Sequence, residues 1–540
     1  MKTIITPFIV FLLVVFTNIA FSQITFQKTY SSGQGNGHSA MTRTNDNGYI
    51  LAGVAVNSLL PGIYYLNIIK LDSNGNYVWR KFFGDSAALF FEPSSIQLCT
   101  DGGFILCGSA IIHPLLFNKS YLIKVSSMGN VLWCRIFEEE LAEELCFVTQ
   151  TNDGGFAACG YSSSSPLRKC LLIKTDSNGI LQWSKSITDT NTLYGFMALH
   201  LSQTSDIGFI ICGATRNTVG DPANNSTIIK TDSSGNTQWM RSYGTPYYDE
   251  FKNVYETADG GFMVGGSIDA TNDSIVNPYY LLLKTDSAGV VLWAKTFGIS
   301  NMVGYVWYHL SKLLPLSDGS YQLNGAATNL NGNFLLYSVN ADSNGNYLSS
   351  KTHMEIVNYE GIDMLQTLDS GFFIAALGPK NPIGSILKGD SYFIKTDKNC
   401  NSFCTDSIPA HVTGNINLPL LSTSFVESVG DSTYSWPLSD TTSYVPAITA
   451  ICFSTGIDKI NEQENLINVY PNPFTNSLSV TSSNNQQVTI TIYDIISRKL
   501  LQKQFTNAGT LNTIQLSKGI YIYSVSNKNG VVKKGKVVKE

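Results

Sequence analysis

Short apolar stretches separated by polar turns follow one another along residues 25–404, and within the stretches apolar and polar positions alternate. A period of two is that of a half-buried β-strand, and no helical period of 3.6 competes with it. In one well-defined stretch the pattern predicts four strands, over Phe147–Thr151, Phe156–Tyr161, Cys170–Thr175 and Ile180–Ile187. Gly and Asp in the intervening turns favour tight hairpins, because Gly adopts positive φ and Asp hydrogen-bonds its own backbone. An all-β, antiparallel fold is expected.

This four-strand unit recurs seven times between Thr25 and Cys404. Units of about fifty residues with four antiparallel strands are typical of β-propeller blades. The last unit lacks its fourth strand, and Phe26-x-Lys28-x-Tyr30 near the N-terminus has the pattern of that missing strand. The sequence therefore predicts a seven-bladed β-propeller over 23–404, closed by an N-terminal strand that removes free sheet edges. The first turn of each unit carries an Asp, at Asp46, Asp101, Asp153, Asp206, Asp259, Asp318 and Asp369.

The fourth strand of most units repeats Trp, a cation and a large apolar residue at every second position. This spacing places the three side chains on one face of the strand. We expect them to pack between neighbouring blades, the stem of the cation covering apolar surface. Carbohydrate stacking on the Trp residues is the alternative. The Trp residues are Trp79, Trp133, Trp183, Trp239 and Trp293.

Connections of variable length should share one face of the propeller, because the other two connections of each unit are short and alike. The variable ones are Val56–Tyr64, Ala110–Ser120, Thr215–Ser226, Ile268–Pro278 and Leu377–Asp390. Variable loops on a rigid scaffold are where binding usually resides. On the same face, a Glu stands nine residues before the turn Asp in four units, at Glu92, Glu144, Glu250 and Glu360.

These four Glu residues should directly precede the innermost strands, near the mouth of the central channel. Grouped carboxylates can hold Ca²⁺ or polar ligands, so they are the candidate ligand- or cation-binding residues. Alternatively, each accepts local backbone N–H bonds or faces water. No cofactor is otherwise indicated.

Motifs for catalysis are absent from the sequence. It contains no Gly-x-Ser-x-Gly, His-Glu-x-x-His or P-loop pattern, and its six His residues have no metal-ligand spacing. We therefore assign no catalytic and no metal-binding residue. Net charge is −5 with 14% charged residues, and a nucleic-acid partner is not expected without a concentrated basic surface.

Ten Cys in 540 residues are too few for a disulfide scaffold. Cys107, Cys159 and Cys212 share one position of the repeat, where we expect small buried strand residues. Cys404–Cys452 is the one bridge that the sequence suggests.

The N-terminus predicts export. Lys2, an apolar run from Ile4 to Phe16 and the small residues Ala20 and Ser22 describe a signal peptide over 1–22. No second long apolar stretch follows, so no membrane span is expected in the mature chain.

After the repeats, residues 405–465 are rich in Ser, Thr and Pro and predict a linker with few strands. Residues 466–540 show short alternating strands and turn signals, which predict a small Ig-like β-sandwich. This last stretch resembles the type A sorting domain of type IX secretion, although Ser497 stands where that family usually has Gly. The matching residues include Pro471, Asn472, Pro473, Arg498, Gly519 and Tyr521.

The resemblance implies passage through the periplasm and across the outer membrane by the type IX secretion machinery, usually with removal of the tail. The product is then released or attached to the cell surface. The repeats also resemble surface propellers with Asp-Gly-Gly and Lys-Thr-Asp units, over about 380 residues. Some of those proteins carry an endoglucanase-like label, and no catalytic residue can be carried over from them.

Three functions fit these observations. The first is a secreted or cell-surface binding or adhesion module for a glycan or protein. The second is an extracellular carbohydrate-active hydrolase, endoglucanase-like, that uses carboxylates on the variable-loop face. The third is a structural component of a surface layer, which the sequence does not separate from the first.

Overall fold

The computed structural model divides into two compact units, Met1–Thr455 and Gly456–Glu540. The predicted signal peptide, 1–22, lies outside the described residues. The structure describes 25–31, 36–56, 64–84, 88–112, 118–138, 143–164, 167–189, 195–216, 224–245, 248–269, 278–299, 308–328, 334–356, 362–377, 391–402, 411–415, 420–421, 425–429, 432–435, 439–441, 447–454, 467–482, 487–494, 498–527 and 530–540.

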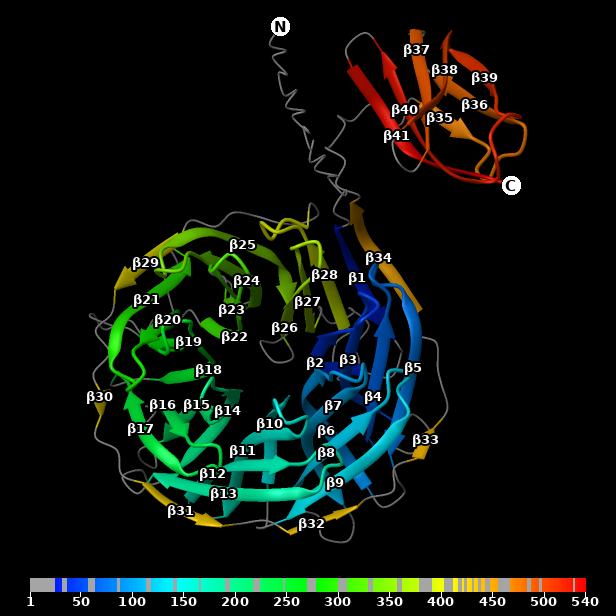
Figure 1. The fold of residues 1–540 in the computed structure, drawn as a ribbon. Helices are drawn as coiled ribbons and strands as arrows, with labels where there is room; N and C mark the ends of the chain where they lie inside the picture. Colours follow the sequence, from blue (N-terminus) through cyan, green and yellow to red (C-terminus); the bar gives the residue numbers. More distant parts are fainter. Residues whose placement is uncertain are drawn as a thin grey trace, which may run out of the picture. The chain divides into compact units, whose positions relative to one another are not determined.

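Repeated antiparallel sheets of four consecutive strands build the first unit, in a propeller-like fold (Figure 1). Six sheets take all four strands from one repeat. These are β2 (Asn36–Arg43), β3 (Tyr49–Val56), β4 (Tyr64–Leu71) and β5 (Tyr77–Gly84); β6 (Ala88–Leu98), β7 (Phe104–Ile112), β8 (Asn118–Val125) and β9 (Val131–Glu138); β10 (Glu143–Gln150), β11 (Phe156–Ser164), β12 (Leu167–Thr175) and β13 (Leu181–Asp189); β14 (Phe196–Gln203), β15 (Phe209–Arg216), β16 (Asn224–Thr231) and β17 (Thr237–Tyr243); β18 (Asp249–Glu256), β19 (Phe262–Asp269), β20 (Pro278–Thr285) and β21 (Val291–Ile299); and β22 (Tyr308–Pro315), β23 (Tyr321–Thr328), β24 (Phe334–Ala341) and β25 (Tyr347–Ile356).

The remaining sheet combines both ends of the unit. β26 (Asp363–Gln366), β27 (Phe372–Leu377) and β28 (Ser391–Thr396) are completed by β1 (Thr25–Ser31), which pairs antiparallel with β28. Phe26 lies opposite Lys395 and Tyr30 opposite Ser391. The predicted role of the N-terminal segment as the missing fourth strand is confirmed by this pairing.

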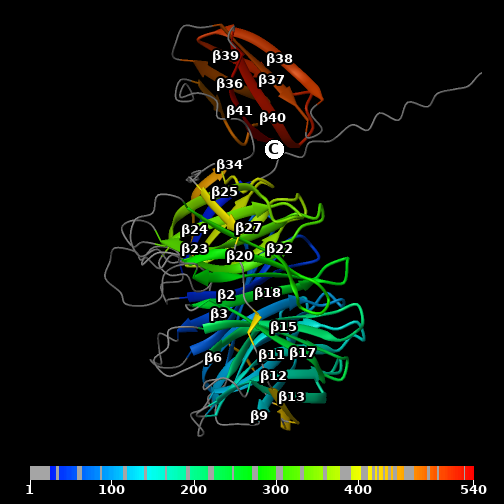
Figure 2. The ribbon, with the colours of Figure 1, turned by 90° about the vertical axis from the view of Figure 1, so that its left-hand side faces the viewer.

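The first strand of each sheet lies innermost, and these inner strands contact one another in sequence around the centre (Figures 1 and 2). The contacts run from β2 to β6, β10, β14, β18, β22 and β26, and β26 in turn contacts β2. Buried apolar side chains fill the space between adjacent sheets, for example Phe104, Leu106 and Tyr121 beside Ile50 and Leu66. The core is thus distributed between sheets and leaves the centre for other side chains.

The Trp residues of the fourth strands pack on the next sheet, as predicted. A Cβ on Gly179 would stand 2.7 Å from Trp133, and one on Gly235 would stand 2.6 Å from Trp183. Both Gly residues have positive φ in the last hairpin turn of the following sheet, so the ring of the Trp takes the place that a side chain would need. Phe26 occupies the same position against Gly75, where a Cβ would stand 2.4 Å from its ring.

Each cation of this pattern reaches the same turn of the neighbouring sheet. Lys185 Nζ donates to Asn236 Oδ1 at 2.8 Å, and Lys28 Nζ in β1 donates to Asn76 Oδ1 at 2.9 Å. The junction made by the N-terminal strand therefore repeats the contacts made between the other sheets.

The repeated turn Asp has a structural partner within its own sheet. In six sheets, a Lys of the third strand lies 2.5–2.9 Å from this carboxylate; the pairs are Lys70–Asp46, Lys124–Asp101, Lys174–Asp153, Lys230–Asp206, Lys284–Asp259 and Lys395–Asp369. The Asp-Gly-Gly and Lys-Thr-Asp elements of the repeat are explained by this ion pair and need no ligand. The Asp72 turn is likewise a hairpin, in which Oδ1 accepts from the N–H groups of Asn74 and Asn76.

The linker predicted over 405–465 differs most from the structure. Six short strands from this segment each pair with the outer strand of a sheet, visiting the sheets in reverse order around the ring (Figure 1). They are β29 (His411–Asn415) on β21, β30 (Leu420–Leu421) on β17, β31 (Phe425–Val429) on β13, β32 (Ser432–Ser435) on β9, β33 (Ser439–Thr441) on β5 and β34 (Ala447–Ser454) on β1.

These additions satisfy part of the outer edge of six sheets, which is why a segment without clear alternation still forms strands. β34 also pairs along the whole of β1, from Thr25 to Ser31. The N-terminal strand is therefore held between two strands from the C-terminal end of the unit.

The second unit consists of two sheets packed through one apolar core, which includes Phe474, Ile490 and Tyr523. One sheet has β35 (Ile467–Tyr470), β36 (Ser477–Ser482) and β39 (Ala508–Asn512), and the other has β38 (Lys499–Thr506), β37 (Gln487–Tyr493), β40 (Gly519–Asn527) and β41 (Gly530–Lys539). This arrangement is that of a small β-sandwich.

The opening motif of the second unit holds its last strand. Asn472 Oδ1 accepts from the N–H of Val538 at 2.9 Å, and its Nδ2 donates to the carbonyl of Lys536 at 3.1 Å. Pro471 and Pro473 both follow cis peptide bonds. Arg498 Nε pairs with Asp494 at 3.0 Å, and the hydroxyl of Tyr521 donates to the carbonyl of Ser517 at 2.6 Å, two residues before Gly519. The sequence motif thus marks contacts that hold the sandwich together.

Cys107, Cys159 and Cys212 are fully buried and free, as expected of small strand residues. The suggested Cys404–Cys452 bridge cannot be followed, since Cys404 lies outside the described residues.

Candidate functional site

A β-bulge recurs at the same place in the inner strands. The register shifts between residues 38 and 40 of β2, 93 and 95 of β6, 145 and 147 of β10, 198 and 200 of β14, 251 and 253 of β18, and 310 and 312 of β22. Bulges bend a strand and re-aim side chains. The residue that follows each bulge, together with Asp363 of β26, forms what we call the wall column: Ala40, Ser95, Phe147, His200, Asn253, Lys312 and Asp363.

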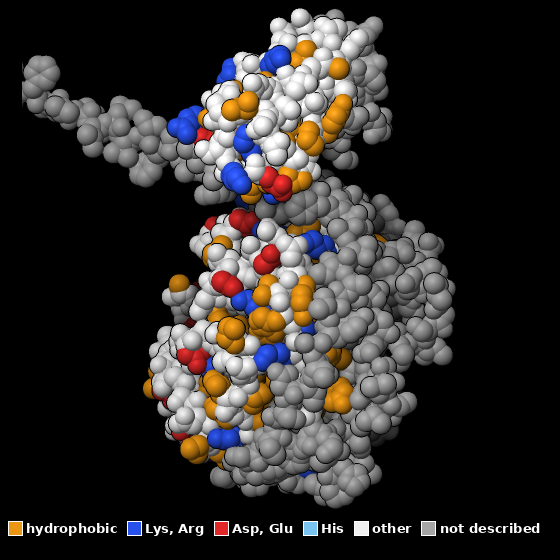
Figure 3. Space-filling view, turned by 90° about the vertical axis from the view of Figure 1, so that its right-hand side faces the viewer, with side chains coloured by type: hydrophobic (Ala, Val, Ile, Leu, Met, Phe, Trp, Pro, Cys, Tyr) orange, Lys and Arg blue, Asp and Glu red, His pale blue; other side chains and the backbone are white. Residues whose placement is uncertain are grey.

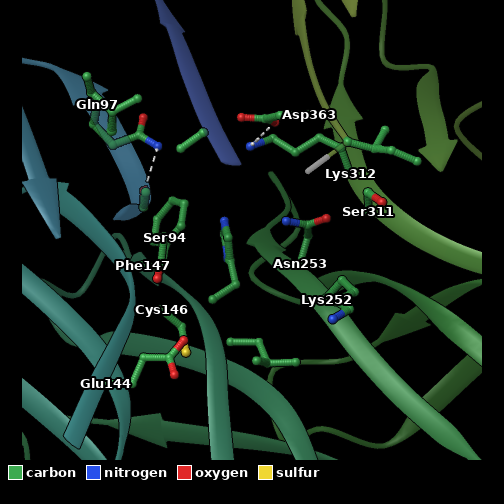
Figure 4. A pocket seen from close by; sticks show the side chains of 16 residues that line it. Ser94, Gln97, Glu144, Cys146, Phe147, Lys252, Asn253, Ser311, Lys312 and Asp363 are labelled. Carbon is green, nitrogen blue, oxygen red and sulfur yellow. Dashed lines mark hydrogen bonds and ion pairs between the residues drawn. The ribbon is translucent and has the colours of Figure 1, made fainter. Parts of the chain in front are cut away.

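A cavity of about 240 Å³ lies at the centre of the first unit, and all seven inner strands contribute to its wall. Figure 4 shows the side chains that line it. Every member of the wall column lines the cavity; the other lining residues are Ser94, Ile96, Gln97, Glu144, Cys146, Leu199, Lys252, Ser311 and Ile362. The wall therefore combines cations, carboxylates, amides and hydroxyls with the rings of Phe147 and His200.

The four predicted Glu residues have different environments. Glu92 is exposed in β6, Glu144 is partly buried in β10 and lines the cavity, and Glu250 is buried in β18. Glu360 lies outside the described residues. The inner strands begin earlier than the sequence suggested, so the three described Glu residues lie within strands and not before them. They do not form one cluster.

Glu250 is the centre of a compact polar group. Its carboxylate lies 3.1 Å from Lys252 Nζ and 3.6 Å from His309 Nε2, and it accepts a hydrogen bond from Tyr248 at 3.1 Å. Burial alone would raise the pKa of Glu250. The charge of Lys252 and the contact with His309 outweigh it and lower the pKa to about 2. Glu250 is thus ionised and committed to neighbouring side chains.

Glu144 shows the opposite shift. Burial and the nearby charge of Glu92 raise its pKa above the usual value, although Tyr161 donates a hydrogen bond to its Oε2 at 2.8 Å. Arg168 lies 5.1 Å from the centre of the Tyr161 ring. A carboxyl group with raised pKa on a cavity wall can hold a proton that a more exposed Glu would lose.

Lys312 and Asp363 form an ion pair across two sheets, at 3.2 Å, and both side chains are largely buried. The second oxygen of Asp363 accepts from the N–H of Met41 in β2 at 3.0 Å. Burial alone would lower the pKa of Lys312, but the charge of Asp363 raises it above the usual value. This group joins β22, β26 and β2 and keeps an ammonium group at the cavity.

His200 and Asn253 make the same connection as Asp363. In each case a side-chain acceptor of the wall column binds the backbone N–H of the next inner strand. The N–H of Val254 donates to His200 Nδ1 at 3.3 Å, and the N–H of Leu313 donates to Asn253 Oδ1 at 2.7 Å. Burial, with a smaller contribution from Lys312, lowers the pKa of His200 to about 3, so its ring is neutral.

Sequence reasoning missed most of this wall. Of the lining residues it proposed only Glu144, as one of four Glu residues near the channel mouth; it did not propose His200, Asn253, Lys252, Lys312 or Asp363. The available signal was the wall column itself, six residues before each turn Asp. An inner strand position that holds Lys, Asp, His and Asn in different repeats is unusual, because such side chains are seldom buried in a strand without a partner.

Two further findings bear on cofactors and membranes. Among the described residues, no three His, Cys, Asp or Glu side chains lie close enough together to hold a metal ion. Nor does that part of the chain contain a helix of the length and hydropathy that a bilayer crossing requires. On the face seen in Figure 3, basic and acidic side chains are interspersed over the described surface.

Residues 468–540 match the family described as the secretion system C-terminal sorting domain. The match covers nearly all of the second unit and confirms the resemblance seen in the sequence. It implies export to the outer cell surface or the extracellular space and interaction with the type IX secretion machinery. The resemblance of the repeats to surface propellers is not confirmed by a family match. No curated protein matches the chain.

Among solved structures, the extracellular domain of a hybrid two-component system from B. thetaiotaomicron aligns at 9% identity and a TM-score of 0.42. It covers 95% of this chain, which spans 58% of that protein's length. The polysaccharide lyase Uly1 aligns at 11% identity and a TM-score of 0.41, over 67% of this chain and 90% of its own. The Penicillium chrysogenum alpha-L-arabinanase, complexed with arabinobiose, aligns at 10% identity and a TM-score of 0.37, over 70% of this chain and 99% of its own. Similarity at this level transfers no activity.

Proposed function

We propose that the first unit is a closed seven-bladed propeller, exported to the cell surface or released, whose central cavity binds a glycan. The cavity wall carries the proposal, because six of the seven inner strands supply polar side chains to it, and His200, Asn253 and Asp363 are held by contacts with the next strand. The ring of contacts between inner strands, completed by β26 and β2, supports closure. So does the repetition of the Trp and Lys contacts by Phe26 and Lys28 of β1.

The size and chemistry of the cavity suit one sugar ring. A cavity of about 240 Å³ gives space for a small group such as one sugar ring, and it does not offer the roughly 800 Å² of surface that a partner protein usually covers. Sugar hydroxyl groups both donate and accept hydrogen bonds, and the wall offers both kinds of partner. Phe147 adds an apolar surface. A glycan end is therefore favoured over a protein epitope as the ligand.

The test is binding of the full-length secreted protein to a panel of polysaccharides and oligosaccharides. Ser311→Trp places a large side chain in the cavity, and Ser233→Trp makes the same change in an exposed turn. We expect the first variant to lose at least tenfold in glycan affinity and the second to bind as the native protein does. Equal binding by both variants would refute the cavity as the binding site.

Hydrolysis is a second candidate, on one specific observation. Glu144 and Glu250 share a position in the repeat, yet the pKa of Glu144 is raised and that of Glu250 is lowered. Carboxyl groups whose pKa values are driven apart are the usual acid and base of glycoside hydrolysis. If the protein releases reducing ends from a polysaccharide, Glu144→Gln should lower the rate at least a hundredfold. Hydrolysis that survives this change would remove Glu144 from the mechanism.

A further inference from the structure

Three consecutive members of the wall column present hydrogen-bond donors to the cavity. We propose that His200, Asn253 and Lys312 form a binding site for the carboxylate of an acidic sugar. This inference rests on the proposed glycan-binding function and specifies which class of sugar the cavity takes. It follows from how each of the three side chains is used by the neighbouring strand.

His200 is held in one protonation state and one tautomer. Nδ1 accepts the N–H of Val254, so the proton of the neutral ring is on Nε2. The ring is 2% exposed and packs between Phe147 and Tyr255, with centroids 4.1 and 5.1 Å away. Within the described part of the chain, Nε2 has no hydrogen-bond acceptor, although His200 lines the cavity. The atom left for a ligand is an N–H donor.

Asn253 is oriented by the same kind of contact. Its Oδ1 accepts the N–H of Leu313 at 2.7 Å, which fixes which end of the amide is oxygen. The side chain is 4% exposed, and no acceptor among the described residues binds its Nδ2. Figure 4 shows this nitrogen turned toward the open middle of the cavity and the oxygen turned to the wall. A second buried donor therefore faces the same space.

Lys312 adds a positive charge. One of its N–H groups is used by Asp363 at 3.2 Å, and an ammonium group has three. Figure 4 shows its nitrogen at the edge of the same open space as the amide of Asn253. Lys252 is a further ammonium group on the cavity wall.

A carboxylate matches this set better than a hydroxyl does. A carboxylate only accepts hydrogen bonds, whereas a hydroxyl also needs an acceptor to be fully satisfied. The acceptor atoms of His200 and Asn253 already accept hydrogen bonds from the N–H groups of Val254 and Leu313. Buried donors left without a partner are costly, and bonds to a charged acceptor are stronger than bonds to a neutral one. Glu144 uses its Oε2 to accept from Tyr161, and its Oε1 remains for a hydroxyl group of the sugar.

The experiment compares ligands of one shape and different charge. Calorimetry on the full chain would measure the affinity for oligogalacturonate, for its methyl ester and for the matching galactose oligomer. We expect the acid to bind at least tenfold more tightly than either neutral form. Equal binding of the acid and its ester would overturn the carboxylate site and leave the glycan-binding function standing. No binding of acidic or neutral sugars by the native chain would overturn both.

The variant Asn253→Asp tests the donor directly. Aspartate keeps an oxygen to accept the N–H of Leu313 and replaces the cavity-facing NH₂ by a second oxygen. We expect at least a tenfold loss for the acid, with a smaller change for the neutral oligomer. Asn178→Asp, in an exposed turn, makes the same charge change away from the cavity and should bind as the native chain does. Unchanged affinity of a folded Asn253→Asp protein would refute the site, and if this variant does not fold, the comparison of acid with ester decides alone.

Discussion

The hairpin turns and the cavity wall of the first unit use the same repeated backbone for different purposes. At the turns, residues recur in almost every sheet: Trp183 on Gly235 resembles Trp133 on Gly179, and Lys174–Asp153 resembles Lys230–Asp206. Along the wall column the backbone bulge recurs but the side chain differs in each sheet. The repeated residues build the ring, and the residues that do not repeat give the cavity its chemistry.

The wall column also shows that one side chain can both hold the neighbouring strand and contribute to the chemistry of the cavity. His200, Asn253 and Asp363 each accept a backbone N–H from the next strand, which is a structural task that recurs around the ring. Each contact uses one acceptor atom, and the remaining polar atoms differ between an imidazole, an amide and a carboxylate. Their differences make the cavity asymmetric within a nearly symmetric frame.

The largest effect is expected at the junction between β1 and the neighbouring sheet. Phe26 is fully buried and takes the position of the Trp residues, so Phe26→Ala should lower the free energy of unfolding by about 3–5 kcal/mol. Urea unfolding would measure it. Met128→Ala, at a side chain that is 67% exposed, should stay within about 0.5 kcal/mol of the native protein. Equal stability of the two variants would show that β1 does not hold the ring together.

A smaller loss is expected for the buried carboxylate beside the wall. Glu250 has its pKa lowered to about 2, so Glu250→Gln should cost about 2–3 kcal/mol at pH 7. Because the folded pKa lies below the unfolded one, this stability is present above pH 4.5 and is lost as the pH falls toward 2. A pH series of unfolding midpoints should therefore converge for the native and variant proteins in acid. A constant difference across that range would contradict the assigned ion pairs.

Glu144, at the same repeat position, should behave in the opposite sense. Its folded pKa is raised, so its ionised form destabilises the fold as the pH rises above the unfolded value. Glu144→Gln should leave stability at pH 7 unchanged or raise it by less than the Glu250 loss, with no effect in acid. Unfolding midpoints of the two Gln variants at pH 4 and pH 7 would show the contrast. A loss at Glu144 as large as that at Glu250 would mean that the two sites are alike.

The smallest effect is expected at a repeated turn. Burial would raise the pKa of Asp153, but hydrogen bonds from Lys174, Thr151 and the backbone lower it to about 2. Its side chain is 54% exposed, so solvent screening limits Asp153→Asn to about 0.2–1 kcal/mol. This stability is lost as the pH falls from about 4 toward 2. Thermal unfolding would detect it, and a loss above 2 kcal/mol would place the turn pair among the main supports of the ring.

The sequence predicted the sheets well because their signals are local. Alternation, Gly turns and the Trp pattern each lie within one repeat, and the displaced fourth strand was recognisable because Phe26, Lys28 and Tyr30 have the same spacing as its counterparts. The outer strands β29–β34 were missed, since their pairing depends on the free edges of sheets that are distant in the chain.

The candidate site was predicted only in part. Glu144 lines the cavity, Glu250 contacts Lys252 and His309, and Glu92 is exposed, so a ligand at these Glu residues stays a prediction. No member of the wall column was proposed as a binding residue. Its members are single residues in strands that otherwise look alike, and their importance comes from meeting at the centre.

The sequence by itself determined an all-β chain of repeated four-stranded sheets with a secretion tail, because alternation, turns and the sorting motif are written over short distances. Only the tertiary structure decided which atoms face the cavity. His200 and Asn253 become donors because Val254 and Leu313, on the next strand, take their acceptors. That outcome depends on how strands more than fifty residues apart lie beside one another, which no local pattern records.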